Sequence, residues 1–166
     1  PFPNPAHEGA EVVDGHPPVY DHTPPCVGLD TDYLLEHGGE SEIVPVADMT
    51  HTKKDGSKVE WFEHTSPVSK IIFRKAITKT PKVVAYAYGE IAAPKAGRYL
   101  LALGSDEGVA VWVNGKRVHY KLLKRAIVED DDLVPVTLKK GQNRILIKVE
   151  QGAGGMGICS ARAFSR

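Results

Sequence analysis

The side chains best suited to chemistry lie in a turn, where Asp106 and Glu107 precede Gly108. Two neighbouring carboxylates, together with backbone carbonyl oxygens, are the ligands that a hard cation such as calcium prefers. The simpler interpretation is structural, because an acidic residue before glycine stabilises a turn by hydrogen bonding to its own backbone. We favour the turn and expect neither a metal nor a cofactor, with calcium as the alternative.

Two indole rings could each present a flat apolar face to a sugar. Trp61 lies in the segment 59–63, and Trp112 lies in an alternating run on the face opposite the valines of that run. A tryptophan within a strand usually fills a core, because its large apolar surface contributes much when it is buried. We therefore favour a core role for Trp112, and for Trp61 we weigh a core role and a binding role equally. Both remain candidate ligand-binding residues.

Other potential metal ligands lack a recognisable spacing. The histidines before residue 70 do not show the paired helical spacing of zinc enzymes and are interpreted as loop residues: His7, His16, His22, His37, His51 and His64. The acidic run 129–132 predicts a solvated turn, and Asp30 and Asp32 predict a helix cap, each with calcium binding as the alternative. We find no nucleophile elbow, phosphate-binding glycine loop or metalloprotease helix, and therefore expect no catalytic residues.

Short strands with a period of two must position these residues. The segment 109–118 alternates valines on one face and reverses at Asn114-Gly115, which predicts a hairpin with a two-residue turn. Further strands are expected over 59–63, 71–77, 83–92, 98–103, 134–138, 143–150 and 158–164. About eight strands indicate an all-β fold, an antiparallel two-sheet sandwich of the jelly-roll type. Tyr86 and Tyr88 share one strand face and are expected in its interior.

The first 58 residues differ in composition, since they contain most of the prolines and their apolar residues are scattered. This composition predicts a loop-rich cover over one sheet, with functional or disordered loops as the alternative. One short helix is expected over 30–37, ended by Gly38-Gly39. A length of 166 residues with 42% hydrophobic residues fits one domain, 1–166, with 59–166 as its strand-rich core.

Charge and chain ends narrow the classes of partner. Twenty-one basic residues balance 21 acidic ones, so we expect neither a nucleic acid nor an anionic membrane surface as partner. No apolar run reaches the length of about 18 residues that a membrane-spanning helix needs.

The chain begins at Pro1 without methionine, which suggests an excised or processed piece of a longer protein. Cys26 and Cys159 leave a long-range disulfide and two separate thiols both open.

Four motifs together suggest a relationship: PFPN at 1–4, DYL at 32–34 with GGE at 38–40, GSDEG at 104–108 leading to VWVNG at 111–115, and LKKGQN at 138–143. They resemble motifs of the galactose-binding-like jelly-roll accessory domains beside bacterial polysaccharide-degrading catalytic domains, a group that includes many carbohydrate-binding modules. The hairpin is also similar to that of the protective-antigen-insert β-sandwich family, in which two adjacent aspartates hold calcium and help bind sugar in some adhesins. Glu107 stands in place of the second aspartate, so the resemblance does not favour calcium here.

The resemblance implies a non-catalytic carbohydrate-binding accessory module of a secreted or periplasmic glycan-active protein. Its partners would be a polysaccharide or oligosaccharide and a neighbouring domain, and its site would include Trp61, Asp106, Glu107 and Trp112. The alternative is a structural or protein-interaction domain that packs against a catalytic neighbour and binds no sugar. A small hydrolase or lyase ranks third and would require titratable groups that converge in a cleft.

Overall fold

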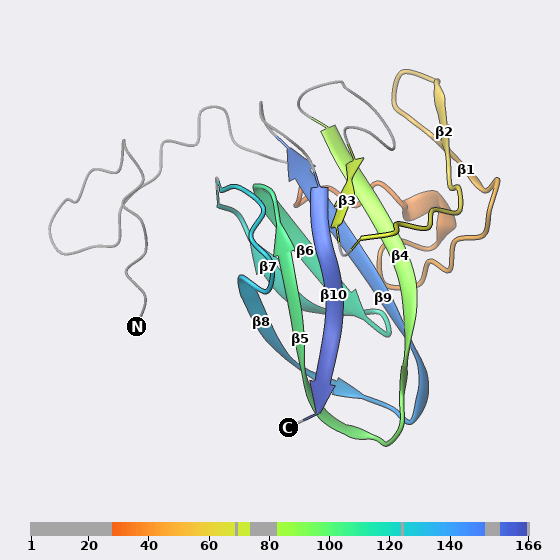
Figure 1. The fold of residues 1–166 in the computed structure, drawn as a ribbon. Helices are drawn as coiled ribbons and strands as arrows, with labels where there is room; N and C mark the ends of the chain where they lie inside the picture. Colours follow the sequence, from red (N-terminus) through yellow and green to blue (C-terminus); the bar gives the residue numbers. More distant parts are fainter. Residues whose placement is uncertain (1–27, 69, 74–82, 124, 152–156, 166) are drawn as a thin grey trace, which may run out of the picture.

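The computed structural model describes residues 28–68, 70–73, 83–123, 125–151 and 157–165. Two four-stranded antiparallel sheets face each other (Figure 1). The first has the order β4-β9-β6-β7, from β4 (Val83–Ala93), β9 (Gly141–Gln151), β6 (Gly108–Val113) and β7 (Lys116–Lys121). The second has the order β3-β10-β5-β8, from β3 (Lys70–Ile72), β10 (Gly157–Ser165), β5 (Gly97–Ser105) and β8 (Asp132–Leu138). The predicted all-β, antiparallel two-sheet sandwich is confirmed.

Strict alternation builds the core between the sheets. In β8, buried and exposed residues alternate without a break, and Pro135 is tolerated because β8 is an edge strand that needs no backbone donor on its open side. The inward valines of β6 are fully or almost fully buried, as the alternation predicts. The centre of the core comprises Leu101, Leu103, Val109, Val111, Val113, Val134, Val136, Leu138, Ile145, Ile147 and Val149.

The predicted hairpin joins β6 and β7, which pair antiparallel. Asn114 and Gly115 have φ angles of 50° and 84°, the left-handed values that a mirror-image two-residue turn requires. Gly115 has a second reason to be glycine, because a Cβ atom there would collide with the backbone oxygen of Ser41. The hairpin turn is therefore in direct contact with a segment 74 residues earlier.

One buried asparagine joins two turns. The side-chain amide of Asn143 donates to the carbonyl oxygens of Lys139 and Gly141, both at 2.9 Å, and its oxygen accepts from the Lys139 amide at 3.0 Å. The same oxygen accepts from the Asn114 side chain at 2.8 Å. The motif at 138–143 therefore has a structural role, since it closes the β8–β9 turn and fixes it to the hairpin.

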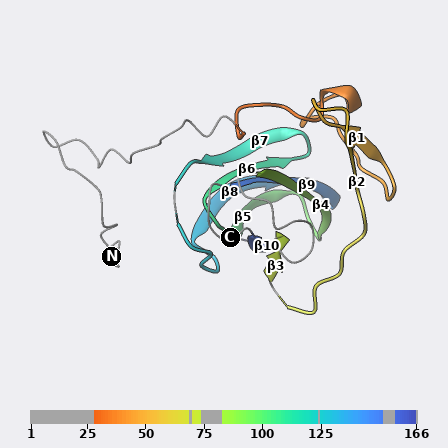
Figure 2. The ribbon, with the colours of Figure 1, turned by 90° about the horizontal axis from the view of Figure 1, so that it is seen from above.

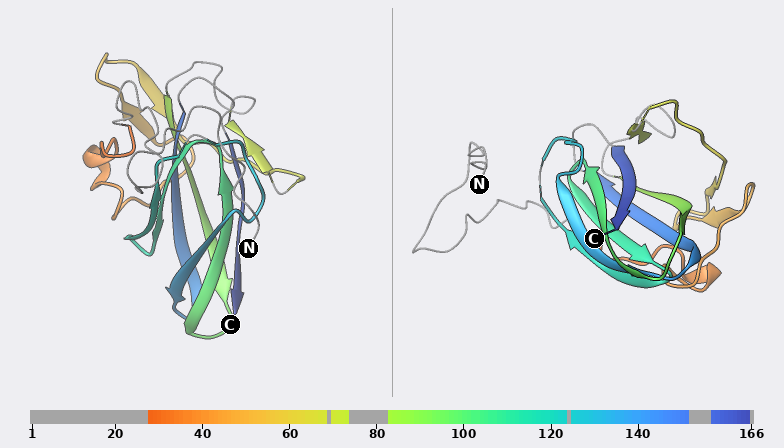
Figure 3. Two further views of the ribbon diagram at one scale, coloured as in Figure 1. Left: turned by 90° about the vertical axis from the view of Figure 1, so that its left-hand side faces the viewer. Right: turned by 60° about the horizontal axis from the view of Figure 1, so that its bottom comes forward.

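Residues 28–62, here called the cover, lie over the outer face of the β4-β9-β6-β7 sheet (Figures 2 and 3). The cover contains a 3-10 turn, η1 (Leu35–His37), and a two-stranded ribbon of β1 (Thr50–Thr52) and β2 (Lys58–Glu60). The loop-rich cover expected over 1–58 stays a prediction as a whole, because residues 1–27 lie outside the described ranges. No helix in the described part of the chain is long and apolar enough to cross a membrane.

Three local predictions differ from the structure. The helix expected over 30–37 is a single 3-10 turn, because the Asp32 carboxylate accepts the amides of Leu34 (2.8 Å) and Glu40 (3.0 Å) and so closes a compact loop. The strand expected over 59–63 is β2, which pairs with β1 outside both sandwich sheets. Tyr86 and Tyr88 lie on the outer face of β4, where they are partly buried, and not between the sheets.

Two further predictions concern residues outside the described ranges. Cys26 lies outside them, and the side chain of Cys159 is not described, so the proposed disulfide stays a prediction. The strand expected over 71–77 is seen as β3 up to Ile72, and 74–82 lie outside the described residues.

Candidate functional site

A buried lysine fixes the cover to the sheet. Lys148 is fully buried on the outer face of β9, and its ammonium donates to the carbonyl oxygens of Leu29 (3.0 Å) and Thr31 (2.7 Å). A third bond, of 2.8 Å, goes to the Glu40 carboxylate, which also accepts from the Tyr86 hydroxyl at 2.6 Å. Three acceptors satisfy all three ammonium protons. Lys148 is therefore a structural anchor with no free lone pair for nucleophilic chemistry.

Apolar side chains surround this anchor and bury one of the two tryptophans. The outer cluster contains Leu29, Leu34, Ile43, Ala110, Trp112 and Leu146. Trp112 is 5% exposed, so its indole faces the cover and not solvent. Trp112 is a core residue, which is the role that the sequence analysis favoured, and its burial leaves little ring surface for a ligand.

Trp61 is placed differently, since it is partly exposed at the margin of the outer cluster. Its backbone amide donates to the Met49 carbonyl, and its carbonyl accepts from the Asp48 amide, both at 2.8 Å. The indole lies 6.3 Å from the Tyr86 ring, at an interplanar angle of 44°. These backbone bonds fix the main chain at Trp61, so that less of the chain has to be ordered when a ligand binds.

The outer face of β4 extends this aromatic surface. Tyr86 and Tyr88 lie two residues apart on the same face, and we call Trp61, Tyr86 and Tyr88 the aromatic row. The Tyr88 hydroxyl donates to Glu90 at 3.1 Å, and Arg144 pairs with Glu90 across the β4–β9 ladder. Burial, and then the Glu90 carboxylate, raise the pKa of Tyr88. The row therefore ends in charged and hydroxyl groups.

The turn between β5 and β6 holds Asp106 and Glu107. Asp106 is 8% exposed, and Glu107 adopts a left-handed φ of 50° while its amide donates to the Arg125 carbonyl at 3.2 Å. Burial, and then the Glu107 charge, raise the pKa of Asp106 to about 6, although Arg125 acts in the opposite direction. Within the described ranges, neither residue belongs to a group of three side chains close enough to share an ion.

A buried ion-pair cluster lies beside this turn, where sequence reasoning expected a solvated acidic loop. Asp132 is 5% exposed, and the Arg125 guanidinium donates to both of its carboxylate oxygens. The same guanidinium reaches Ser105 Oγ at 2.7 Å and Asp131 at 2.6 Å. The acidic run is therefore organised around a cation from the same loop, which could have been suspected from the nearness of Arg125 to residues 129–132.

Two groups from β7 complete the contacts of Asp132. Lys121 Nζ lies 2.6 Å from one carboxylate oxygen, and His119 Nε2 lies 3.4 Å from the other. Burial by itself would raise the pKa of Asp132, but the contact with His119 and the hydrogen bonds from Arg125 and Lys121 outweigh it and hold that pKa well below its ordinary value. Asp132 thus joins edge strands of the two sheets, β7 and β8.

The raised pKa of Asp106 leads to a pH-dependent prediction. Asp106→Asn should stabilise the protein by about 1 to 2 kcal/mol at neutral pH, because the amide mimics the protonated acid that burial favours. Since the folded-state pKa of about 6 lies above the ordinary 3.8, the wild type is most stable at low pH in this respect and loses stability as the pH rises through 6. Urea unfolding at about pH 4 and about pH 7.5 should therefore show a variant advantage that is present only at the higher pH. An equal or lower stability of the variant at the higher pH would contradict the assignment.

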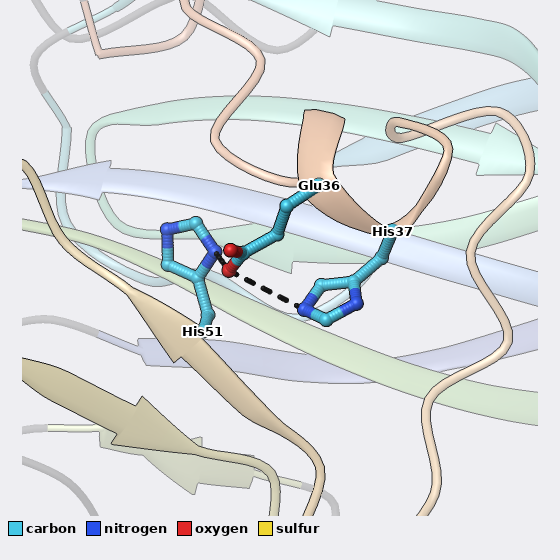
Figure 4. Close-up of side chains that lie close together, drawn as sticks. All are labelled: Glu36, His37 and His51. Atoms are coloured by element: carbon cyan, nitrogen blue, oxygen red, sulfur yellow. Dashed lines mark ion pairs between the residues drawn. The ribbon is translucent and has the colours of Figure 1, made fainter.

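A third cluster brings together two histidines and a carboxylate (Figure 4). Glu36 and His37 come from η1, and His51 comes from β1. Glu36 Oε1 lies 2.5 Å from His51 Nδ1 and 3.4 Å from His37 Nε2, and it accepts the Thr52 amide at 2.8 Å. That amide, and then the histidines, lower the pKa of Glu36. The spacing of 14 residues between the histidines gave no signal in the sequence, because a loop joins them.

Comparisons with known proteins give similarity to solved structures alone. No model of a protein family matches the sequence, and no curated protein matches it. The β-glucosidase of Kluyveromyces marxianus is 16% identical, with a TM-score of 0.46 over 59% of this chain and 13% of that one. The GH31 α-xylosidase of Xanthomonas citri is 15% identical, with a TM-score of 0.41 over 73% of this chain and 16% of that one.

The PA14 domain of the antifreeze protein MpAFP is also similar, at 17% identity and a TM-score of 0.38 over 49% of this chain and 42% of that domain. This chain thus spans 13 and 16% of the length of the two glycosidases. At these identities and TM-scores, the activities of the whole enzymes do not transfer to this chain.

Proposed function

We propose that this domain binds a polysaccharide or oligosaccharide without catalysing a reaction, as an accessory module of a larger, secreted or periplasmic, glycan-active protein. The observation that carries the proposal is the aromatic row, in which a partly exposed Trp61 continues onto two tyrosines of one strand face. The C–H faces of pyranose rings pack on such apolar ring surfaces. The Tyr88 hydroxyl, Glu90 and Arg144 supply hydrogen bonds for sugar hydroxyls at one end of the row.

The carboxylates near the row support a binding role and not a hydrolytic one. A glycosidase needs two carboxylates on opposite sides of the scissile bond, one of them free to act as acid. Glu40 is already bound by Lys148 and Tyr86, and Glu90 accepts from Tyr88. Both are therefore better suited to hold neighbouring donors in place than to transfer protons.

Affinity electrophoresis in gels that contain soluble polysaccharides tests the proposal. Trp61→Ala should weaken retardation by at least about tenfold, because the loss of a stacked ring corresponds to roughly 1.4 kcal/mol. Trp61→Tyr should restore most of the binding, which separates loss of the ring from loss of the fold.

Phe62→Ala provides the matched control. Phe62 is the next residue, is 48% exposed and packs edge-on against His64, outside the aromatic row. We expect this variant to bind as the wild type does. The proposal fails if no polysaccharide retards the protein, or if Trp61→Ala and Phe62→Ala behave alike.

One observation supports a second candidate, a domain that packs against a catalytic neighbour and binds no sugar. On the outer face of the second sheet, Leu100 lies between Pro135 and Phe164 in register, and Leu133 follows on the same face. Leu133 is 59% exposed and Phe164 is 49% exposed, so this is an apolar surface open to a partner. Absence of retardation on every polysaccharide would favour this function.

A further inference from the structure

The geometry points to a site for a divalent transition-metal ion of the zinc class, formed by Glu36, His37 and His51 (Figure 4). Imidazole nitrogens and a carboxylate oxygen are the protein ligands that this class of ion takes, and three such ligands leave a fourth position for water. The three ligand atoms lie within 4.8 Å of one another. In the described part of the chain, this is the one group of three candidate ligands that meets that condition.

The distances between the ligand atoms fit a tetrahedral ion after a small adjustment. Zinc–ligand bonds of about 2.1 Å place two ligand atoms about 3.3 Å apart. Glu36 Oε1 and His37 Nε2 are 3.4 Å apart, which already matches. Glu36 Oε1 and His51 Nδ1 are 2.5 Å apart and would have to separate by roughly 0.8 Å. The Glu36 side chain is exposed at the surface of η1, so a rotation of its carboxylate can provide this movement.

The buried nitrogen of His51 gives an independent reason for an ion. His51 Nδ1 is buried and has no hydrogen bond of acceptable geometry, although it lies close to the Glu36 carboxylate. Buried polar atoms of this kind are usually satisfied. A metal ion between the two groups would satisfy this nitrogen and remove the over-close contact.

The surroundings of the cluster would orient the ligands. The Thr52 amide donates to Glu36 Oε1 and keeps this carboxylate beside the two imidazoles, as outer-shell donors do in metal sites. His37 Nε2 lies 3.0 Å from the Thr50 carbonyl, and binding would require that nitrogen to give up its proton and this contact.

An ion here would stabilise the part of the cover that contains Trp61. It would link η1 to β1, and His51 of β1 pairs directly with Val59 of β2, two residues before Trp61. Metal binding does not depend on the proposed sugar site, and a metal-free protein could still stack a sugar on the aromatic row. The two proposals can therefore fail separately.

Calorimetric titration of the full chain with zinc chloride tests the site, in a background with His7, His16 and His22 replaced by alanine. We expect one ion per chain and a rise in Tm with zinc, because an ion that binds the folded state stabilises it. His51→Ala should weaken binding by tenfold or more and abolish the zinc-dependent rise in Tm. His37→Ala should do the same, and it replaces His51→Ala as the test if that variant does not fold.

His64→Ala is the matched control, since His64 is an exposed histidine outside the cluster. It should bind zinc as the background protein does. Absence of zinc binding in the background protein overturns the proposal. Equal binding by the His51→Ala, His37→Ala and His64→Ala proteins also overturns it, because the ion would then lie elsewhere.

Discussion

Lys148→Met is expected to destabilise the protein by about 3 to 5 kcal/mol, because it removes a fully buried ammonium that donates to one carboxylate and two carbonyl oxygens. Methionine has nearly the same length, so lost packing contributes little to the effect. The affected acceptors are Glu40, Leu29 and Thr31, all in the cover. Urea unfolding measures the loss of stability, and limited proteolysis under native conditions should show earlier cleavage within residues 28–62.

Two further variants make this result specific. Lys58→Met removes an exposed lysine of β2 and should change stability by less than about 0.5 kcal/mol. Glu40→Gln in the Lys148→Met background should recover part of the loss, because it removes the unpaired charge. If Lys148→Met is as stable as Lys58→Met, the ammonium does not hold the cover in place.

Asp132→Ala should lower the free energy of unfolding by a similar amount, about 3 to 5 kcal/mol at neutral pH. The reason is that it removes the main partner of the buried Arg125. The pKa of Asp132 is lowered in the folded state. Its contribution to stability is therefore present above its ordinary pKa of about 4, and it is lost as the pH falls through the lower pKa of the folded state. The difference in free energy of unfolding between the wild type and the variant should therefore become smaller at acidic pH. Unfolding at several pH values measures this narrowing.

Asp131→Ala is the control for this experiment. Asp131 contacts the same guanidinium at 2.6 Å but is exposed, and exposed ion pairs contribute at most about 1 kcal/mol. A loss in Asp131→Ala as large as in Asp132→Ala would show that burial of the pair is not what makes Asp132 important.

Much of the fold followed from local patterns. The turn at Asn114-Gly115 was predictable because few residues other than glycine and asparagine adopt two consecutive left-handed conformations. The inward valines and outward Trp112 of β6 follow from the side-chain period of two, which any extended strand imposes. Alternation, however, says only that two residues share a face, so it did not reveal that Tyr86 and Tyr88 lie on the outer face of their sheet and not between the sheets.

The polar clusters depended on contacts that no local pattern encodes. Lys148 alternates with apolar residues like a solvent-facing lysine, yet it is fully buried because a segment 119 residues earlier lies over it. Asp132 was misjudged, and the proximity of His37 and His51 was not predicted, since each arrangement is defined by partners from other elements.

The amino-acid sequence by itself determined the strands, their inward faces, the hairpin turn and the loop-rich character of the cover, because backbone sterics and side-chain alternation act between near neighbours. The tertiary structure alone decided which tryptophan is buried, which charges are paired and which histidines meet. The physical reason is that burial and charge pairing depend on how the cover packs over the sheet and how the two sheets meet at their edges.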